Sequence, residues 1–273
     1  MTTLAARGVQ NDLFGMVAQE PRLYVLSRPL LDLREVARFL EEEAILWRRT
    51  SGATDAEDII EFAGRICYMS FGDKQSPKSN REYVQTLIRQ EHESVLEHAS
   101  WTFLLTGVSR AFTHQLVRHR VGFSFSQLSQ QYHDETSAKF VMPEEVKANP
   151  ATLELWLRLI EELRRGYQSI SNNLKIDDRE TPASSREARR SARSAARSIL
   201  PNATETKIVF SANGRALRHF LGTRGAIPGD LEMRKVSALI YSRLEDEAPA
   251  LLADFEISPT DDGYPLIRRK HIG

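Results

Sequence analysis

The least ordinary chemistry in this chain lies between Arg118 and Gln131, a stretch that reads RHRVGFSFSQLSQQ. Three potential cations, Arg118, His119 and Arg120, come first, and serines, aromatic residues and glutamines follow. Arginine suits phosphate because its planar guanidinium can donate two parallel hydrogen bonds. If RHR lies on one helix turn, Arg118 and Arg120 point about 200° apart at ~100° per residue and can serve two anionic ligands. A solvated helix end explains RHR alone equally well.

A second arginine-rich stretch, residues 185–198, contains a single glutamate. Three explanations of it stay open: a nucleic-acid-binding face, a helix with a solvated basic side, and arginines that bind the phosphate of a small ligand. For the third, Arg197 is the best candidate, because it lies close to Pro201, where a helix must end and a site can open.

Other motifs offer weaker chemistry. Residues 92–98 read HESVLEH, and Leu96 stands where a metalloprotease would need its second histidine. We therefore expect no metal site but a turn in which Glu93 or Glu97 caps and pairs. Cys67, in the apolar run ICYM, is expected to be a small core residue rather than a nucleophile. No Gly-rich phosphate loop is present, so arginine side chains and helix ends must hold any dinucleotide.

The whole chain limits the class of protein. Its 273 residues suffice for one large domain or two small ones. Its 37 basic and 37 acidic residues balance, which disfavours a dedicated nucleic-acid-binding protein. The single cysteine allows no internal disulfide. The N-terminus lacks a signal-peptide core, and no apolar run approaches the ~20 residues of a membrane span, so we expect a cytoplasmic protein.

Helices and strands alternate along the chain and must position these residues. Strands are expected at residues 22–29, 99–108 and 204–213, with an extended segment at 124–132. Helices are expected at 31–49, 55–71, 81–91, 109–120, 151–174, 184–200, 214–224 and 230–255, with Asp32 near the first start and Ser109 as a cap. This pattern fits an α/β or α+β fold. We expect a flexible arm at 1–18, one domain at 19–260 and a tail at 261–273.

In three separate stretches the chain resembles a known family, the flavin-dependent thymidylate synthases. Residues 118–132 are similar to its signature of RHR, a spacer and a serine within a Gln-Leu-Ser run. Residues 90–103 (QEHESVLEHASWTF) and 196–224 (ARSILPNATETKIVFSANGRALRHFLGTR) are similar to two further family segments in the same order. The resemblance implies a single catalytic domain with a central mixed or antiparallel sheet flanked by helices.

The resemblance also implies a reaction. A methyltransferase of this family carries out FAD-dependent reductive methylation at C5 of dUMP to give dTMP. The carbon donor is 5,10-methylenetetrahydrofolate and the reductant is NADPH. No enzyme cysteine is needed, which agrees with the weak case for Cys67. The family further implies a homotetramer whose active sites are shared between subunits.

Particular residues acquire expected roles from the resemblance. FAD is expected at Ser94, Arg118, His119, Arg120, Gln127, Asn213, Arg215 and His219. The nucleotide is expected at Gln115, Arg118, Gln127, Leu128, Ser129, Gln131, Arg197 and Arg224. His92 matches the histidine beside the isoalloxazine ring and Arg224 the arginine at the uracil edge, so these two are the expected catalytic residues. A guanidinium there would stabilise charge that develops on the uracil in the transition state.

The chain departs from the family pattern in three places. The spacer between Arg120 and Ser129 holds one residue more than is usual, and a local bulge near Gly122 could absorb it. Gln131 stands where the family usually has arginine, and Ser194 stands where it often has glutamate. These changes leave two substrates open, dUMP and the ribonucleotide UMP, the latter for modified-nucleoside synthesis. An RNA- or DNA-binding protein is the remaining, less favoured alternative.

Overall fold

The computed structural model describes residues 15–77, 79–174 and 182–270, which fall into two compact units built from interleaved segments. The first unit comprises Met1–Arg22, Leu105–Val117 and Ser126–Ile208. The second unit comprises Leu23–Leu104, Arg118–Phe125 and Val209–Gly273. Each unit therefore takes its residues from three separate parts of the chain.

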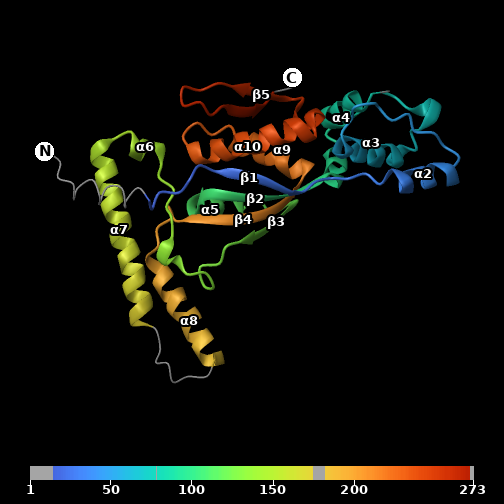
Figure 1. The fold of residues 1–273 in the computed structure, drawn as a ribbon. Helices are drawn as coiled ribbons and strands as arrows, with labels where there is room; N and C mark the ends of the chain where they lie inside the picture. The colour runs from blue at the N-terminus through green and yellow to red at the C-terminus, as the bar shows by residue number, and fades with distance from the viewer. Residues whose placement is uncertain (1–14, 78, 175–181, 271–273) are drawn as a thin grey trace. The chain divides into compact units, whose positions relative to one another are not determined.

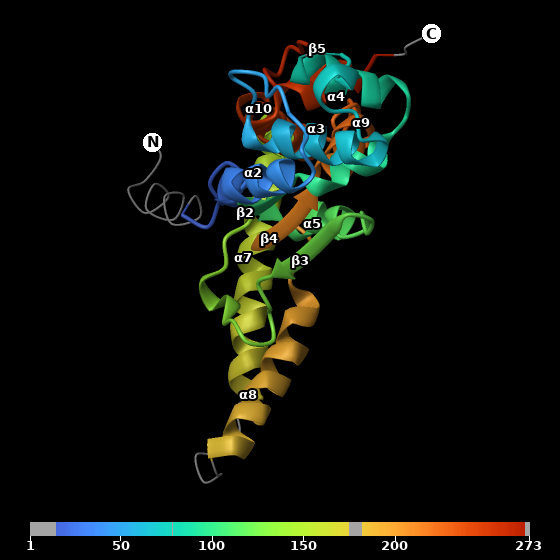
Figure 2. The ribbon, with the colours of Figure 1, turned by 90° about the vertical axis from the view of Figure 1, so that its right-hand side faces the viewer.

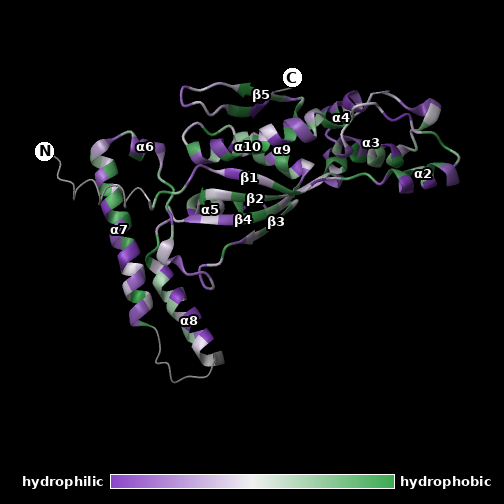
Figure 3. Cartoon of the chain, in the orientation of Figure 1, coloured by the Kyte–Doolittle hydropathy of each residue, from purple (hydrophilic) through white to green (hydrophobic). Residues whose placement is uncertain are grey.

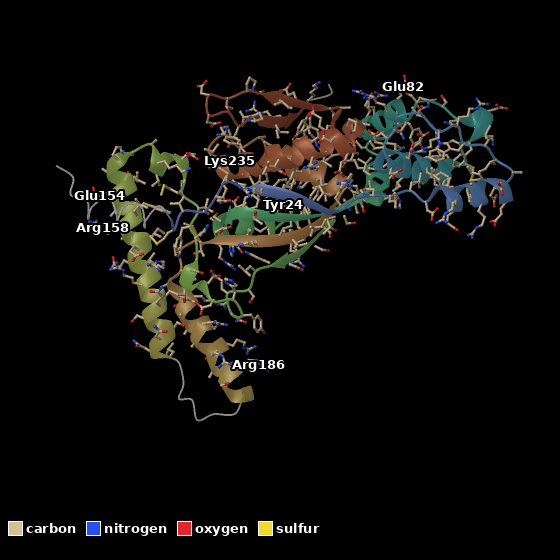
Figure 4. All side chains as sticks on the ribbon, in the orientation of Figure 1. Tyr24, Glu82, Glu154, Arg158, Arg186 and Lys235 are labelled. Atoms are coloured by element: carbon tan, nitrogen blue, oxygen red, sulfur yellow. The ribbon has the colours of Figure 1, made fainter. Side chains whose placement is uncertain are left out.

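A four-stranded sheet has the order β1-β2-β4-β3, with β1 at Arg22–Ser27, β2 at Ser100–Ser109, β3 at Phe123–Gln127 and β4 at Glu205–Asn213 (Figure 1). The run predicted as a buried strand forms β2, in which buried side chains recur at every second position from Trp101 to Leu105 and its last three residues are all buried. Phe103 of β2 packs on Phe210 of β4, with ring centroids 5.2 Å apart. The edge strand β1 leaves Tyr24 exposed (Figure 4). The predicted mixture of helices and antiparallel sheet is confirmed.

The first unit contains a pair of long helices that lie side by side (Figures 1 and 2). They are α7 (Pro150–Asn173), which begins at the N-cap Asn149, and α8 (Pro182–Ala196). Apolar and polar residues alternate around α7 (Figure 3), and Arg186 on α8 is exposed (Figure 4). The unit also contains α5 (Arg110–Leu116), α6 (Glu144–Lys147) and the short turns η3 (Glu135–Ser137) and η4 (Arg197–Ile199). Ser109 caps α5 as predicted, accepting from Phe112 N at 3.0 Å.

The second unit is mainly helical. Its elements are α2 (Leu33–Glu42), α3 (Asp55–Tyr68), η1 (Gly72–Lys74), α4 (Asn80–Arg89), η2 (Glu93–His98), α9 (Gly214–Arg224), α10 (Leu231–Glu247), η5 (Pro249–Leu252), β5 (Phe255–Ser258) and β6 (Leu266–Arg269). Asp32 caps α2 as predicted. A fully buried ion pair joins Glu61 and Arg65 of α3 at 2.6 Å, and Asn80 donates to the other Glu61 oxygen at 2.8 Å. None of the helices in the described ranges is long and apolar enough to cross a membrane.

The expected helix over 109–120 is wrong over its last four residues, 117–120. α5 ends at Leu116, and the N–H of Val117 closes it by bonding back to Thr113 and Gln115. The RHR residues therefore do not share a helix turn, and Arg118 and Arg120 are not related by a helical rotation of ~100° per residue. The chain leaves the helix here because it must turn at Gly122, whose φ is +72°, to enter β3. No sequence signal for the end of the helix stands before Val117.

Four further expectations differ from the structure. Cys67 is exposed rather than in the core, since it lies in the last turn of α3 beyond the buried Gly64 and Arg65. The first predicted helix ends at Glu42, and the last is divided at Ala248 into α10 and η5. A two-stranded antiparallel sheet, β5 with β6, forms near the C-terminus, and β6 falls in the segment expected to be a tail. Its strands are four residues each, too short for a clear period-2 pattern.

Candidate functional site

Helix α9 and its N-cap together carry four of the expected flavin and substrate residues, and the start of the helix is tightly fixed. Asn213 is its N-cap, and its side chain accepts a hydrogen bond from Ala216 N at 2.8 Å. The backbone N–H of Asn213 donates to Gly122 O at 3.2 Å. A Cβ on Gly122 would lie 2.7 Å from Asn213 Nδ2 and 2.9 Å from Ala216 Cβ. The turn at Gly122, where we expected the longer spacer to be absorbed, is therefore packed directly on the cap of α9.

The centre of the RHR segment meets the other end of α9. Arg224 Nε donates to His119 Nε2 at 3.0 Å. The His119 ring also lies edge-on to His219 and Phe220, with centroids 5.7 and 5.3 Å away, and 5.9 Å from the Phe123 ring. Burial lowers the pKa of His119 to about 4, and the Arg224 and His219 charges act in the same direction. The imidazole is therefore neutral at physiological pH.

The turn η2 packs against α9 and carries the HESVLEH motif. Glu97 pairs with Arg215 at 2.7 Å, and Glu93 lies 3.6 Å from Arg215 Nε. The expected pairing of these glutamates is thus confirmed, although neither caps η2. The hydrogen bond from Arg215 to Glu97 raises the pKa of that guanidinium. His92 and Ser94, on the same turn, are exposed.

The second unit thus contains most of the residues expected around FAD, on η2, on the segment 118–125 and on α9. They are His92, Ser94, Arg118, His119, Arg120, Asn213, Arg215 and His219, and the expected nucleotide residue Arg224 lies in the same unit. Arg118 and Arg120 are exposed on either side of the half-buried His119. Guanidinium, hydroxyl and amide groups are the donors that a diphosphate needs, so this set of side chains fits a flavin dinucleotide.

A pocket of about 120 Å³ lies in the first unit, between α5, the end of β3 and the loop that follows η4. Its walls are Arg110, Thr113, His114, Val117, Gln127, Gln130, Leu200, Pro201 and Asn202. Gln127, in its wall, donates to Thr113 Oγ1 at 2.9 Å and to Thr206 Oγ1 at 3.3 Å. The lining is mostly polar, which suits a hydrogen-bonding ligand rather than an apolar one.

Arg110 is the charged residue among the pocket residues that the sequence did not predict. It is half-buried, and Nη1 reaches Leu128 O at 3.4 Å. Burial lowers its pKa, Glu135 opposes that effect, and the nearby charge of Arg197 adds to it. One signal was present: residues 110, 113, 114 and 117 recur at helical spacing, so one face of α5 carries a cation, a hydroxyl and an imidazole.

Among the expected nucleotide residues of this unit, only Gln127 lines the pocket. Ser129 Oγ accepts from Gln131 N at 3.3 Å, and Leu128 N donates to Lys207 O at 2.9 Å, so this stretch is held locally. Gln115 and Arg197 are half-buried on α5 and η4. Gln127 was also expected to contact the flavin, and among the expected flavin residues it is the one that lies in the first unit.

Comparison with known proteins finds thymidylate synthases both in a family model and among individual relatives. Residues 50–250 match a family model described as thymidylate synthase complementing protein. A flavin-dependent thymidylate synthase from Corynebacterium diphtheriae is 41% identical over 243 residues, covering 87% of this chain and 94% of that protein. A protein of the same name from Mycolicibacterium gilvum is 43% identical over 218 residues, covering 77% of this chain and 85% of that protein. These matches agree with the resemblance found in the motifs.

Proposed function

Because this chain belongs to the flavin-dependent thymidylate synthase family, we propose that it methylates dUMP at C5 to give dTMP, with FAD as its flavin, 5,10-methylenetetrahydrofolate as carbon donor and NADPH as reductant. One observation carries the proposal within the molecule. The RHR segment and the helix α9, two separate parts of the resemblance, meet through the hydrogen bond between His119 and Arg224. Residues 105 positions apart are joined by the fold where a shared site requires them.

The second unit offers the residues that would hold FAD. Exposed Arg118, Arg120 and Ser94 are available to its diphosphate, and Asn213 and His219 lie on the helix that faces His119. Arg215 is engaged by Glu93 and Glu97, so an anionic ligand must share it with them. When bound, the flavin would supply the redox chemistry of the reaction. We assign His92 to a position beside its ring system.

We assign Arg224, in the second unit, to the uracil edge of the nucleotide. Its guanidinium would stabilise negative charge as it develops on the uracil, an effect that is stronger in the transition state than in the ground state. Gln127 and its polar pocket suit hydrogen bonds to the nucleotide. The remaining residues that we assign to the nucleotide are Gln115, Arg118, Leu128, Ser129, Gln131 and Arg197.

Gln131 and Ser194 bear on the choice between dUMP and UMP. Both are half-buried, and Gln131 is tied through its backbone N–H to Ser129 Oγ. A neutral side chain at 131 removes a charge from the nucleotide side, which leaves methylation of UMP as the second candidate activity. Competing kcat/KM values for dUMP and UMP decide between them. A preference for dUMP of about a thousandfold, ~4 kcal/mol, would eliminate the UMP activity. We also propose a homotetramer in the cytoplasm.

The experiment that tests the function combines cofactor content with turnover. Purified protein should show flavin absorbance or take up added FAD, and should convert dUMP to dTMP with methylenetetrahydrofolate and NADPH. Arg224→Ala should lower turnover by ~10²- to 10³-fold, as when one transition-state donor is removed, while FAD still binds. A colourless protein that takes up no FAD and shifts labelled RNA would instead support the nucleic-acid-binding alternative. Near-normal turnover by Arg224→Ala would refute the role of that residue.

A further inference from the structure

We propose that His119 is a positioning residue for Arg224: its bare Nε2 accepts a hydrogen bond from Arg224 Nε and sets the plane in which the guanidinium meets the pyrimidine. This inference rests on the proposed function. It adds to the expected flavin contact of His119 a second role, directed at the substrate side of the site.

The chemistry of the two nitrogens fixes which of them donates the hydrogen bond. Arg224 Nε and His119 Nε2 are 3.0 Å apart, an ordinary hydrogen-bond distance. Arginine has no acceptor and stays protonated, so Arg224 must donate and Nε2 must carry a lone pair. The imidazole is then neutral, with its proton on Nδ1. The bond therefore fixes the tautomer of His119 as well as the direction of the guanidinium.

The surroundings of His119 keep it in that form. Two charged or titratable groups act on the imidazole, Arg224 and His219, and both come from α9. Each would repel a proton on the ring, and burial disfavours the charged form further. Phe220 and Phe123 contact the ring from α9 and from the start of β3. The site is thus built to hold a neutral acceptor next to a permanent cation.

The hydrogen bond from Arg224 to His119 limits the orientations that the Arg224 guanidinium can adopt. An arginine side chain has several rotatable bonds, and an unheld guanidinium would spread over many orientations. A bond at Nε restrains the plane of the whole group. Since a misplacement of about 1 Å can cost 10²-fold in rate, a partner that fixes this plane supports turnover without touching the substrate.

The test uses two substitutions that differ in one property. His119→Phe keeps an aromatic ring for Phe123 and Phe220 to contact but removes the acceptor. His119→Gln loses the ring but places an amide oxygen near the position of Nε2. Because both substitutions also remove the expected flavin contact of His119, rates are measured with FAD added to saturation. Under these conditions we expect His119→Phe to lose about 10- to 100-fold in kcat with a smaller change in dUMP Kd, and His119→Gln to recover most of that loss. Equal rates for the two variants, or full activity of His119→Phe, would overturn the proposal.

Two controls separate this inference from the proposed function. In an Arg224→Ala background the difference between His119→Phe and His119→Gln should vanish, since the acceptor then has nothing to hold; a persistent difference counts against the proposal. Nitrogen NMR of the flavin-loaded wild type should show His119 as the neutral tautomer protonated at Nδ1, and Arg224→Ala should alter that signal. This readout needs no turnover. Failure of wild type to methylate dUMP would refute the proposed function, whereas the other tautomer, or an unchanged signal, would refute the pairing.

Discussion

Replacing Gly122 with alanine should destabilise the start of α9 by more than the cost of a left-handed backbone conformation alone. Gly122 has φ +72°, and the added Cβ would lie 2.7 Å from Asn213 Nδ2 and 2.9 Å from Ala216 Cβ. The left-handed backbone costs an L-residue ~1–2 kcal/mol, and overpacking adds about 1–3 kcal/mol. The free energy of unfolding of the second unit should therefore fall by roughly 2–5 kcal/mol.

Gly52→Ala provides the matched control. Gly52 has φ +84° in the same unit, but nothing lies within 4 Å of the Cβ that would be added. It should lose only the backbone cost, about 1–2 kcal/mol. The assay is denaturant unfolding of both variants at one protein concentration, with FAD content measured alongside. Equal losses of stability in the two variants would refute the packing argument, as would unchanged FAD binding by Gly122→Ala together with unchanged stability.

Three other changes should have defined outcomes. The pKa of His119 is about 4 in the folded protein against an ordinary 6.5, so the unfolded chain binds more protons between these two pH values. The free energy of unfolding should therefore fall as the pH drops from 6.5 toward 4, and should fall less in His119→Gln. Denaturant midpoints at several pH values check this, and parallel curves for the two proteins would contradict it. Glu61→Gln should lower the free energy of unfolding by about 3–5 kcal/mol, because it leaves the fully buried Arg65 charge without its carboxylate. A measured loss under ~1 kcal/mol would be inconsistent with a fully buried Arg65–Glu61 ion pair. Arg110→Ala should raise the KM for dUMP with little change in FAD content if the polar pocket serves the nucleotide, and an unchanged KM would exclude Arg110 from it.

Local patterns were sufficient for most elements of the fold. The apolar spacing predicted α7 and α9, the β-branched and aromatic residues predicted β2, and the side chains of Asp32 and Ser109 marked helix starts where they cap in the structure. In each case the determinant lies within a few residues of the element. The end of α5 had no such local signal, because it depends on where Gly122 packs against Asn213, a contact made across the fold.

For the candidate site too, the sequence indicated residue types but not the contacts made across the fold. Residue types and motif order identified the RHR segment and the arginines of α9, but not their contacts. The bond between His119 and Arg224 spans a sequence separation of 105, which no periodicity can reveal. Cys67 was misplaced for a related reason, since burial at the end of a helix depends on what packs there. Arg110 was overlooked because a single arginine on a short helix is ordinary until the pocket beside it is seen.

The interleaving of the two units has a consequence for synthesis of the protein. The side chains expected around the flavin come from η2, from residues 118–125 and from α9, with the whole arginine-rich α8 made in between. A nascent chain that has exposed RHR to solvent still lacks Asn213 and Arg224, so the cofactor has nothing complete to bind until translation is well past the middle. Loading with flavin must therefore be a late event, and partially synthesised or C-terminally truncated chains should emerge colourless.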